Sequence, residues 1–176
     1  MAAYGAAAAT EDLERARSWV AEIWDACKVF DVPPAVLAAV ISRETRFFPK
    51  WMTPPSKGGQ LGDGGHGHGP GQIDDRSFPE WCMRWRGGDF DTAQGISKSA
   101  EVLRQKVDAL RFAIKDQQER LRCAVAAYNC GEGRVLRALR DGTDIDDLTT
   151  GNNYSEDVLE RARVFEVLFE MPKKAG

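Results

Sequence analysis

Three of the four carboxylic acids between residues 42 and 77 have the types and spacing that acid–base chemistry needs. Glu44 lies at the end of an apolar stretch, AVLAAVISRET (35–45), and Asp63 and Asp74 lie on or just after a glycine-rich loop. Burial of a carboxyl group beside apolar residues raises its pKa, which lets a glutamate donate a proton near neutral pH. Glu44 is therefore the candidate acid. Each aspartate has an alternative reading as a loop residue that caps its own backbone.

The loop itself has an unusual composition, because eight of the 17 glycines of the chain fall within residues 58–71 (GGQLGDGGHGHGPG). Glycine tolerates positive φ and lets a backbone approach a ligand closely, so the loop is a candidate for substrate contact. His66 and His68 have a spacing that suits a pair of metal ligands. They are the only two histidines in the chain, so we expect neither a metal ion nor any other cofactor.

Four separated motifs resemble those of goose-type lysozymes and the related lytic transglycosylases, in the same order along the chain. The motifs are ISRET (41–45), GDGGHGHG (62–69), GQIDDRS (71–77) and AVAAYNCGEGRV (124–135). The resemblance covers about residues 30–168 and implies a mainly α, α+β lysozyme-like fold with a small β-hairpin beside the active-site cleft. One departure is the stretch of nineteen positions from Glu44 to Asp63, several more than is usual in that family.

The resemblance also implies roles for particular residues. Glu44 would be the general acid, and Asp63 and Asp74 would orient or activate the attacking water. The residues that would contact the sugar or line the cleft are Gln72, Ile73, Tyr128, Asn129 and Tyr154. The family pattern favours Asp74 over its neighbour Asp75, and side-chain alternation along a strand would send Asp75 to the opposite face.

The implied reaction is cleavage of the β-1,4 bond between N-acetylmuramic acid and N-acetylglucosamine in peptidoglycan, with inversion. In that mechanism the carboxyl groups lie about 6.5–9.5 Å apart, which leaves room for the water. Three alternatives stay open: a lytic transglycosylase that closes a 1,6-anhydro ring, a chitinase, and a non-catalytic glycan-binding module. The aspartates favour a hydrolase over a transglycosylase, whereas the acidic pI suits chitin better than peptidoglycan.

Helical periodicity predicts the elements that must position these residues. Apolar side chains recur at steps of three and four residues, which is the period of an amphipathic helix. Helices are expected over residues 11–30, 33–46, 92–113, 117–129, 133–140 and 154–170, with a short helix or turn within 77–90. Thr10 is the expected N-cap of the first helix. Residues 1–10 are expected to form a flexible arm before a single catalytic domain, residues 11–172.

Composition limits the classes of function. The formal net charge of −3 and the pI of about 5.5 argue against a nucleic-acid-binding protein. No apolar run approaches the length of a membrane span. The four cysteines are widely spaced and are expected to be free, mostly buried thiols. Arg43, Arg46 and Arg76 lie beside the candidate site, where they would form either a positive rim or a solvated surface.

The first residues, MAAYGAAAAT, lack the basic region and apolar core of a secretory signal. We therefore expect either that a signal has been removed or that the enzyme leaves the cell by another route, as phage lysins do. Its expected place of action is the cell wall, in the extracellular space or the periplasm. The expected partner is a peptidoglycan or chitin-type glycan chain. The resemblance also admits a proteinaceous lysozyme inhibitor, and the chain is expected to be a monomer.

Overall fold

The computed structural model describes residues 2–47 and 53–170, which are mainly helical, as predicted. Its helices are α1 (Ala2–Arg17), α2 (Val20–Phe30), α3 (Pro34–Thr45), α5 (Pro79–Gly87), α6 (Thr92–Leu110), α7 (Gln117–Cys130), α8 (Glu132–Asp141) and α9 (Tyr154–Phe169). Short 3-10 turns are η1 (Pro55–Lys57), η2 (Asp63–Gly65), η3 (Ile145–Leu148) and η4 (Thr150–Asn152). The strands β1 (Gly67–His68) and β2 (Ile73–Asp74) complete the described elements.

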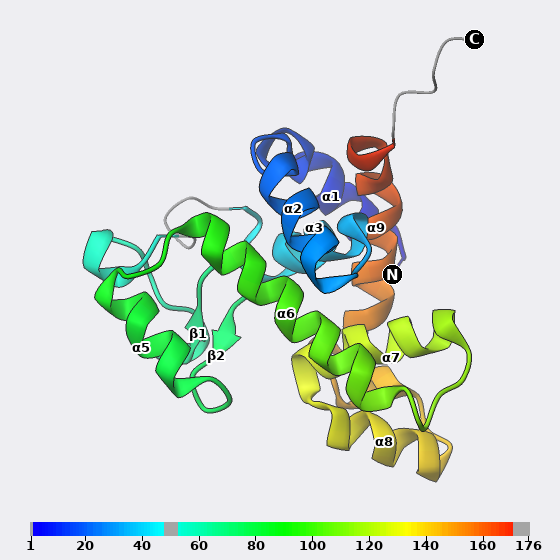
Figure 1. Cartoon of the computed structure of the whole chain (residues 1–176). Helices are drawn as coiled ribbons and strands as arrows, with labels where there is room; N and C mark the ends of the chain where they lie inside the picture. The colour runs from blue at the N-terminus through cyan, green and yellow to red at the C-terminus, as the bar shows by residue number, and fades with distance from the viewer. Residues whose placement is uncertain (1, 48–52, 171–176) are drawn as a thin grey trace, which may run out of the picture.

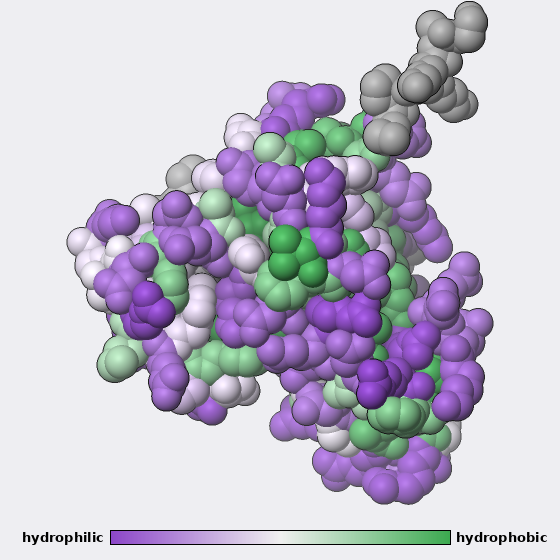
Figure 2. Space-filling view, viewed as in Figure 1, coloured by the Kyte–Doolittle hydropathy of each residue, from purple (hydrophilic) through white to green (hydrophobic). Residues whose placement is uncertain are grey.

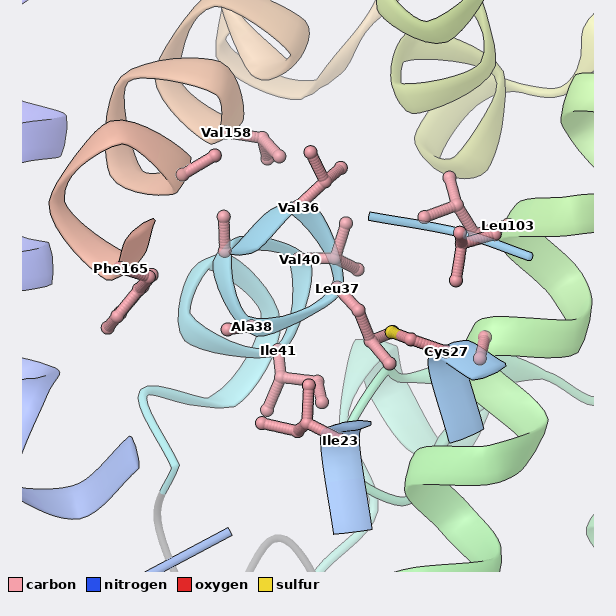
Figure 3. Packing of buried hydrophobic residues seen from close by; sticks show 14 of the residues in the cluster. Ile23, Cys27, Val36, Leu37, Ala38, Val40, Ile41, Leu103, Val158 and Phe165 are labelled. Atoms are coloured by element: carbon pink, nitrogen blue, oxygen red, sulfur yellow. The ribbon is translucent and has the colours of Figure 1, made fainter. Parts of the chain in front are cut away.

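Helix α3 lies at the centre of the main core, and α1, α2, α6 and α9 contact it (Figure 1). It is apolar on nearly every side, and such a helix is stable only when it is surrounded. Figure 3 shows Ile23 of α2, Leu103 of α6 and Phe165 of α9 packed around it. The long helix α6 crosses the molecule and links the part that contains α5 and the hairpin to the part that contains α7 and α8 (Figure 1).

The hairpin has the predicted place in the chain and the predicted antiparallel pairing. Gly67 pairs with Asp74 and His68 pairs with Ile73. Each strand is only two residues long, so the pairing itself is weak and must be supported by side chains.

The N-terminal residues differ from the expected flexible arm, because α1 begins at Ala2. Alanine has the highest helix propensity, and this alanine-rich segment also packs against α9, where Ala9 is fully buried. Gly5 lies so close to α9 that a Cβ there would be 2.7 Å from Asp157 Oδ1. Thr10 is not an N-cap, since its hydroxyl donates to the Ala6 carbonyl inside the helix at 2.9 Å.

The single helix expected over residues 11–30 is broken into two. The chain leaves helical geometry at Trp19 (φ −122°, ψ 10°), between α1 and α2. The break lets α1 pack mainly on α9 while α2 packs on α6, which one straight helix would not reach. Periodicity did not reveal it, because Ala16 and Ile23 on the two sides of the break are both fully buried.

The surface and the cysteines agree with an ordinary globular domain. Figure 2 shows a mostly hydrophilic face with small, separated hydrophobic areas. None of the helices in residues 2–47 and 53–170 combines the length and apolar character that a membrane span requires. Cys27, Cys82 and Cys123 are buried free thiols, and Cys130 is a partly buried one.

Candidate active site

Glu44 lies in the last turn of α3, where the helix leaves the core. Its carboxyl group is partly buried, and Oε1 accepts a hydrogen bond from the Tyr154 hydroxyl at the start of α9. Burial raises the pKa of Glu44 to about 7, and the charge of Asp63 adds to this rise. The Tyr154 hydrogen bond and the charge of Arg43 lower the pKa by smaller amounts. Glu44 therefore holds a proton over a pH range in which an exposed glutamate would be ionised.

A second tyrosine lies close to the same carboxyl group. Tyr128 of α7 donates its hydroxyl hydrogen to the Gly71 carbonyl at 2.9 Å, which joins α7 to the hairpin. Burial raises the pKa of Tyr128, and the charge of Glu44 raises it further, so the two side chains interact electrostatically. Next to Tyr128, Asn129 accepts a hydrogen bond at Oδ1 from the Thr150 backbone N–H at 2.8 Å. The α7 C-terminus, the hairpin and α9 thus meet around the acid.

Asp63 and Asp74 lie together across the hairpin and bind the same arginine. Asp74 is at the end of β2, and Asp63 begins the exposed turn η2. Nη2 of Arg76 lies 3.1 Å from Asp63 Oδ2 and 2.6 Å from Asp74 Oδ2. The hydrogen bond from the Arg76 side chain is the main reason that the pKa of Asp74 is lowered. The structure therefore brings the two predicted aspartates together, in an environment that favours the ionised form of Asp74.

Gln72 and Ile73 have structural contacts in addition to their place beside the cleft. The Ile73 side chain is only 2% exposed and lies in a small core with Cys82 and Val102. The Gln72 amide donates to the Gly69 carbonyl at 3.1 Å and fills the space in which a Cβ on Gly62 or Gly67 would lie. The glycines at these two positions thus make room for a side chain of the protein itself.

A pocket of about 190 Å³ lies between the hairpin, α6 and α7. Five of the predicted site residues line it: Gln72, Ile73, Asp74, Tyr128 and Asn129. Lys106 of α6 also lines the pocket, and its Nζ is 2.6 Å from Glu132 Oε2 at the start of α8. The pocket therefore offers an anionic and a cationic group beside the residues that the motifs single out.

The other face of the hairpin carries a separate polar cluster around Asp75. His66 Nδ1 lies 2.8 Å from Asp75 Oδ1, and the buried His68 lies 3.4 Å from Oδ2, which Arg86 also contacts. The pKa of Asp75 falls to about 2, chiefly through the hydrogen bond with His66. Asp75 lies in the turn just after β2, and its partners differ from those of Asp74, which binds Arg76. In the described part of the chain no three His, Cys, Asp or Glu side chains gather in a way that would hold a metal ion.

The three arginines considered as a rim are all engaged with acids. The pairs include Arg43 Nε with Asp157 Oδ2 at 3.4 Å, Arg46 Nε with Asp12 Oδ1 at 2.8 Å, and the Arg76 contacts above. Arg43 also lies over the Tyr154 ring, 5.7 Å from its centre. From the sequence, Arg76 was identified only as a neighbour of the site, and its ion pairs with the aspartates were not predicted. Its position two residues after Asp74 could have indicated an ion pair between the two. The sequence offers no such indication for Lys106, because only the fold brings this residue to the pocket.

Comparison with known proteins identifies the family of this chain. The family model described as "Lysozyme g" matches residues 3–167. The chain is 31% identical over 161 residues to lysozyme g of Takifugu rubripes, which covers 88% of this chain and 77% of that protein. It is 32% identical over 163 residues to lysozyme g of Cyprinus carpio, covering 89% and 77% respectively. Lysozyme g of Struthio camelus is 28% identical over 137 residues, with 77% and 59% covered. A helical fold with an acid held beside a hairpin and a match over nearly its whole length together place this chain in the lysozyme g family of glycoside hydrolases.

Proposed function

We propose that this chain hydrolyses the β-1,4 bond between N-acetylmuramic acid and N-acetylglucosamine in peptidoglycan. Glu44 protonates the leaving oxygen. Asp63 and Asp74 orient or activate a water that attacks the opposite face of the sugar, so the product is inverted. Gln72, Ile73, Tyr128, Asn129 and Tyr154 form the surroundings in which the sugar is held.

One observation carries the proposal: two of the candidate catalytic carboxyl groups have their pKa values pushed in opposite directions. Burial raises the pKa of Glu44 to about 7, whereas Arg76 lowers that of Asp74. An acid that stays protonated beside a carboxylate that stays ionised is the division of labour that glycoside hydrolysis needs. A non-catalytic glycan-binding module has no use for such a difference, so this alternative is disfavoured.

Glu44→Gln tests the acid directly, because it keeps the shape of the side chain and removes the proton that is donated. We expect cleavage of purified peptidoglycan to fall by about 100-fold or more. The melting temperature and the binding of the glycan to the variant should stay close to those of the wild type. The control is Glu80→Gln, which removes an exposed glutamate on α5, outside the site. Retained cleavage in Glu44→Gln would remove Glu44 from the mechanism.

The reaction type is tested by the products. Hydrolysis leaves a reducing end, whereas a lytic transglycosylase leaves a 1,6-anhydro end. We expect reducing ends with the α configuration at first appearance, observed by NMR of fresh digests. The support is the pair of aspartates beside the acid, since a transglycosylase needs no group that activates water. A predominance of anhydro ends would reverse the assignment.

Peptidoglycan is favoured over chitin by Lys106. The lactyl group of N-acetylmuramic acid carries a carboxylate that chitin lacks, and Lys106 places a cation in the pocket beside Tyr128 and Asn129. We expect Lys106→Gln to reduce cleavage of peptidoglycan by about 10-fold, which corresponds to one charge-assisted hydrogen bond, and to change cleavage of chitooligosaccharides little. The control is Arg104→Gln, which removes a cation from α6 that pairs with Asp31 and Asp108 elsewhere. Equal losses on the two substrates would contradict this assignment.

A further inference from the structure

Arg76 makes an unusual set of contacts with the two aspartates of the site. Its Nη2 contacts Asp63 Oδ2 at 3.1 Å and Asp74 Oδ2 at 2.6 Å, so one nitrogen joins both carboxylates. Its Nε lies 2.9 Å and 3.0 Å from the two oxygens of Asp74. The Arg76 backbone N–H also donates to Asp74 Oδ1 at 2.8 Å. Asp74 is thus held by a fork of donors, and Asp63 is attached to the same guanidinium.

Two carboxylates that share one nitrogen are close enough to repel each other strongly. A cation placed between two carboxylates offsets this repulsion. An arginine stays charged at every relevant pH, and its planar fork matches a carboxylate. Arg76 therefore provides both the charge that offsets this repulsion and the geometry that holds the two carboxyl groups in place.

Asp63 depends on this contact for its position. It has φ 46°, in the left-handed region, and lies on a turn whose next residue, Gly64, also has positive φ. Its side chain is 71% exposed, so the surrounding protein packs little against it. Within the described part of the chain, Arg76 is the residue that binds the Asp63 side chain. An exposed aspartate with no such contact would sample several rotamers.

The contacts of the neighbouring Asp75 show that the ion pairs that anchor the hairpin are separate from the ion pairs of Arg76. Asp75 has a separate set of partners, His66, His68 and Arg86. The hairpin therefore has a structural ion-pair cluster that does not involve Arg76. The Arg76 fork is therefore not needed for that cluster and can serve the two aspartates of the site.

We propose that Arg76 is a positioning residue that holds the carboxyl groups of Asp63 and Asp74 together, facing the water that attacks the sugar. The inference rests on the proposed hydrolysis and deepens it, since it says how an exposed aspartate on a glycine-rich turn is held ready. Arg76 itself contacts the aspartates and takes no part in bond making or breaking.

The test compares Arg76→Gln, Arg76→Lys and a control, Arg84→Gln, which removes another exposed arginine that pairs with an aspartate, Asp89. The readouts are kcat, KM and the pH dependence of kcat/KM on soluble peptidoglycan fragments. For Arg76→Gln we expect kcat to fall by about 100-fold, because misplacement of a reacting group by about 1 Å has that effect. KM should change less than about threefold.

The pH profile separates positioning from a purely structural role. Arg76 lowers the pKa of Asp74, so its removal raises that pKa, and the acid limb of the profile should move to higher pH. Other charged groups near the pair are Glu44, His68, Asp75 and Lys106, and all of them are kept in the variants. Arg76→Lys keeps the charge and loses the fork, so its acid limb should stay near that of the wild type while kcat is only partly retained.

Several outcomes would overturn the inference. One is that Arg76→Gln keeps the kcat and the acid limb of the wild type. Another is that its activity falls equally at every pH and the fall is explained by a lower melting temperature. Asp63→Asn and Asp74→Asn distinguish this failure from failure of the proposed function. If both asparagine variants hydrolyse peptidoglycan normally, the hydrolytic role of the aspartates is wrong. If they are inactive while Arg76→Gln is normal, only the role of Arg76 is wrong.

Discussion

Tyr154 connects the acid to a helix that lies 110 residues further along the chain. Its hydroxyl donates to Glu44, and this hydrogen bond stabilises the ionised carboxylate more than the neutral acid. The contact thus limits how far burial raises the pKa of Glu44. The hydroxyl also fixes the direction of the carboxyl group, which in the proposed mechanism presents its proton to one oxygen of the substrate.

Tyr154→Phe should therefore move the basic limb of the pH profile. Removal of the hydroxyl raises the pKa of Glu44 above its present value of about 7, so the acid stays protonated to higher pH. Because activity is lost as Glu44 ionises, the basic limb of kcat/KM should shift to higher pH, even though kcat falls. The measurement is kcat/KM from pH 4 to pH 10.

The comparison variant is Tyr128→Phe. Its hydroxyl donates to the Gly71 carbonyl and not to Glu44, so the basic limb should stay where it is while activity itself declines. A shift of the basic limb to lower pH in Tyr154→Phe would mean that the hydroxyl stabilises the neutral form of Glu44 more than its ionised form. The direct role of Tyr154 in setting the pKa of Glu44 would then be wrong.

Single residues were predictable from sequence where their local pattern carried the information. Glu44 follows a continuous apolar run, and such a run predicts a buried helix with a shielded carboxyl group at its end. Asp63 and Asp74 were singled out by motif, but their shared contact with Arg76 is a matter of tertiary geometry. Lys106 could not be predicted, because nothing near it in the sequence indicates that α6 turns this residue toward the pocket.

At the scale of elements, the hairpin is held by side chains because its strands are so short. The Gln72 amide lies over β1, in space that Gly62 and Gly67 leave free. On one side Tyr128 binds the Gly71 carbonyl, and on the other side the Asp75 cluster is attached to α5 through Arg86. These contacts set the position of Asp63 and Asp74 relative to α3.

Gly62→Ala should displace the turn that carries Asp63. The new Cβ would overlap with Gln72 Oε1, so either the amide or the backbone must move. We expect a loss of about 1–3 kcal/mol in the free energy of unfolding, which is typical of overpacking, and a fall in activity of at least about 10-fold. Urea titration and peptidoglycan cleavage measure the two effects.

Two further variants check the cause. In Gly62→Ala combined with Gln72→Ala the obstructing amide is gone, so most of the stability should return. Gly133→Ala, in α8, introduces a Cβ that meets no atom within 4 Å and should stabilise the protein by about 0.5–1 kcal/mol. If the double variant is no more stable than Gly62→Ala alone, the overlap with Gln72 is not what makes Gly62 necessary.

The elements that periodicity predicted well are helices in which one regular apolar pattern runs from end to end. Helix α6 begins as expected after Asp91, which forms a capping box with Gln94, and α7 and α9 lie within a residue of their expected ends. The predictions failed where packing decided the outcome. The alanine-rich segment forms a helix that packs against α9. The helix breaks at Trp19 because α1 and α2 pack against different elements. Neither partner is visible in a local window of sequence.

At the scale of the whole molecule, a buried ionic network joins the first helix to the helix of the acid and to the last helix. Asp12 of α1 is fully buried and accepts hydrogen bonds from Ser42 Oγ at 2.6 Å and Arg46 Nε at 2.8 Å. Arg161 of α9 donates to the same serine hydroxyl at 2.9 Å. Ser42 precedes Glu44 by two residues, so the network also fixes the part of α3 that carries the acid.

Asp12→Asn tests how far the fold depends on this network. The amide keeps the shape of the side chain but removes the buried charge that faces Arg46 and Arg161, and removal of one partner from a buried ion pair typically costs about 3–5 kcal/mol.

Glu11→Gln is the matched control, because Glu11 binds the same Arg46 guanidinium at 2.8 Å from a position that is 71% exposed. That exposed pair should contribute less than about 1 kcal/mol. Urea unfolding at pH 7 should therefore show a loss several times larger for Asp12→Asn than for Glu11→Gln. Equal losses would mean that α1 is held by its apolar contacts with α9 and that the buried charges add little to the placement of the acid.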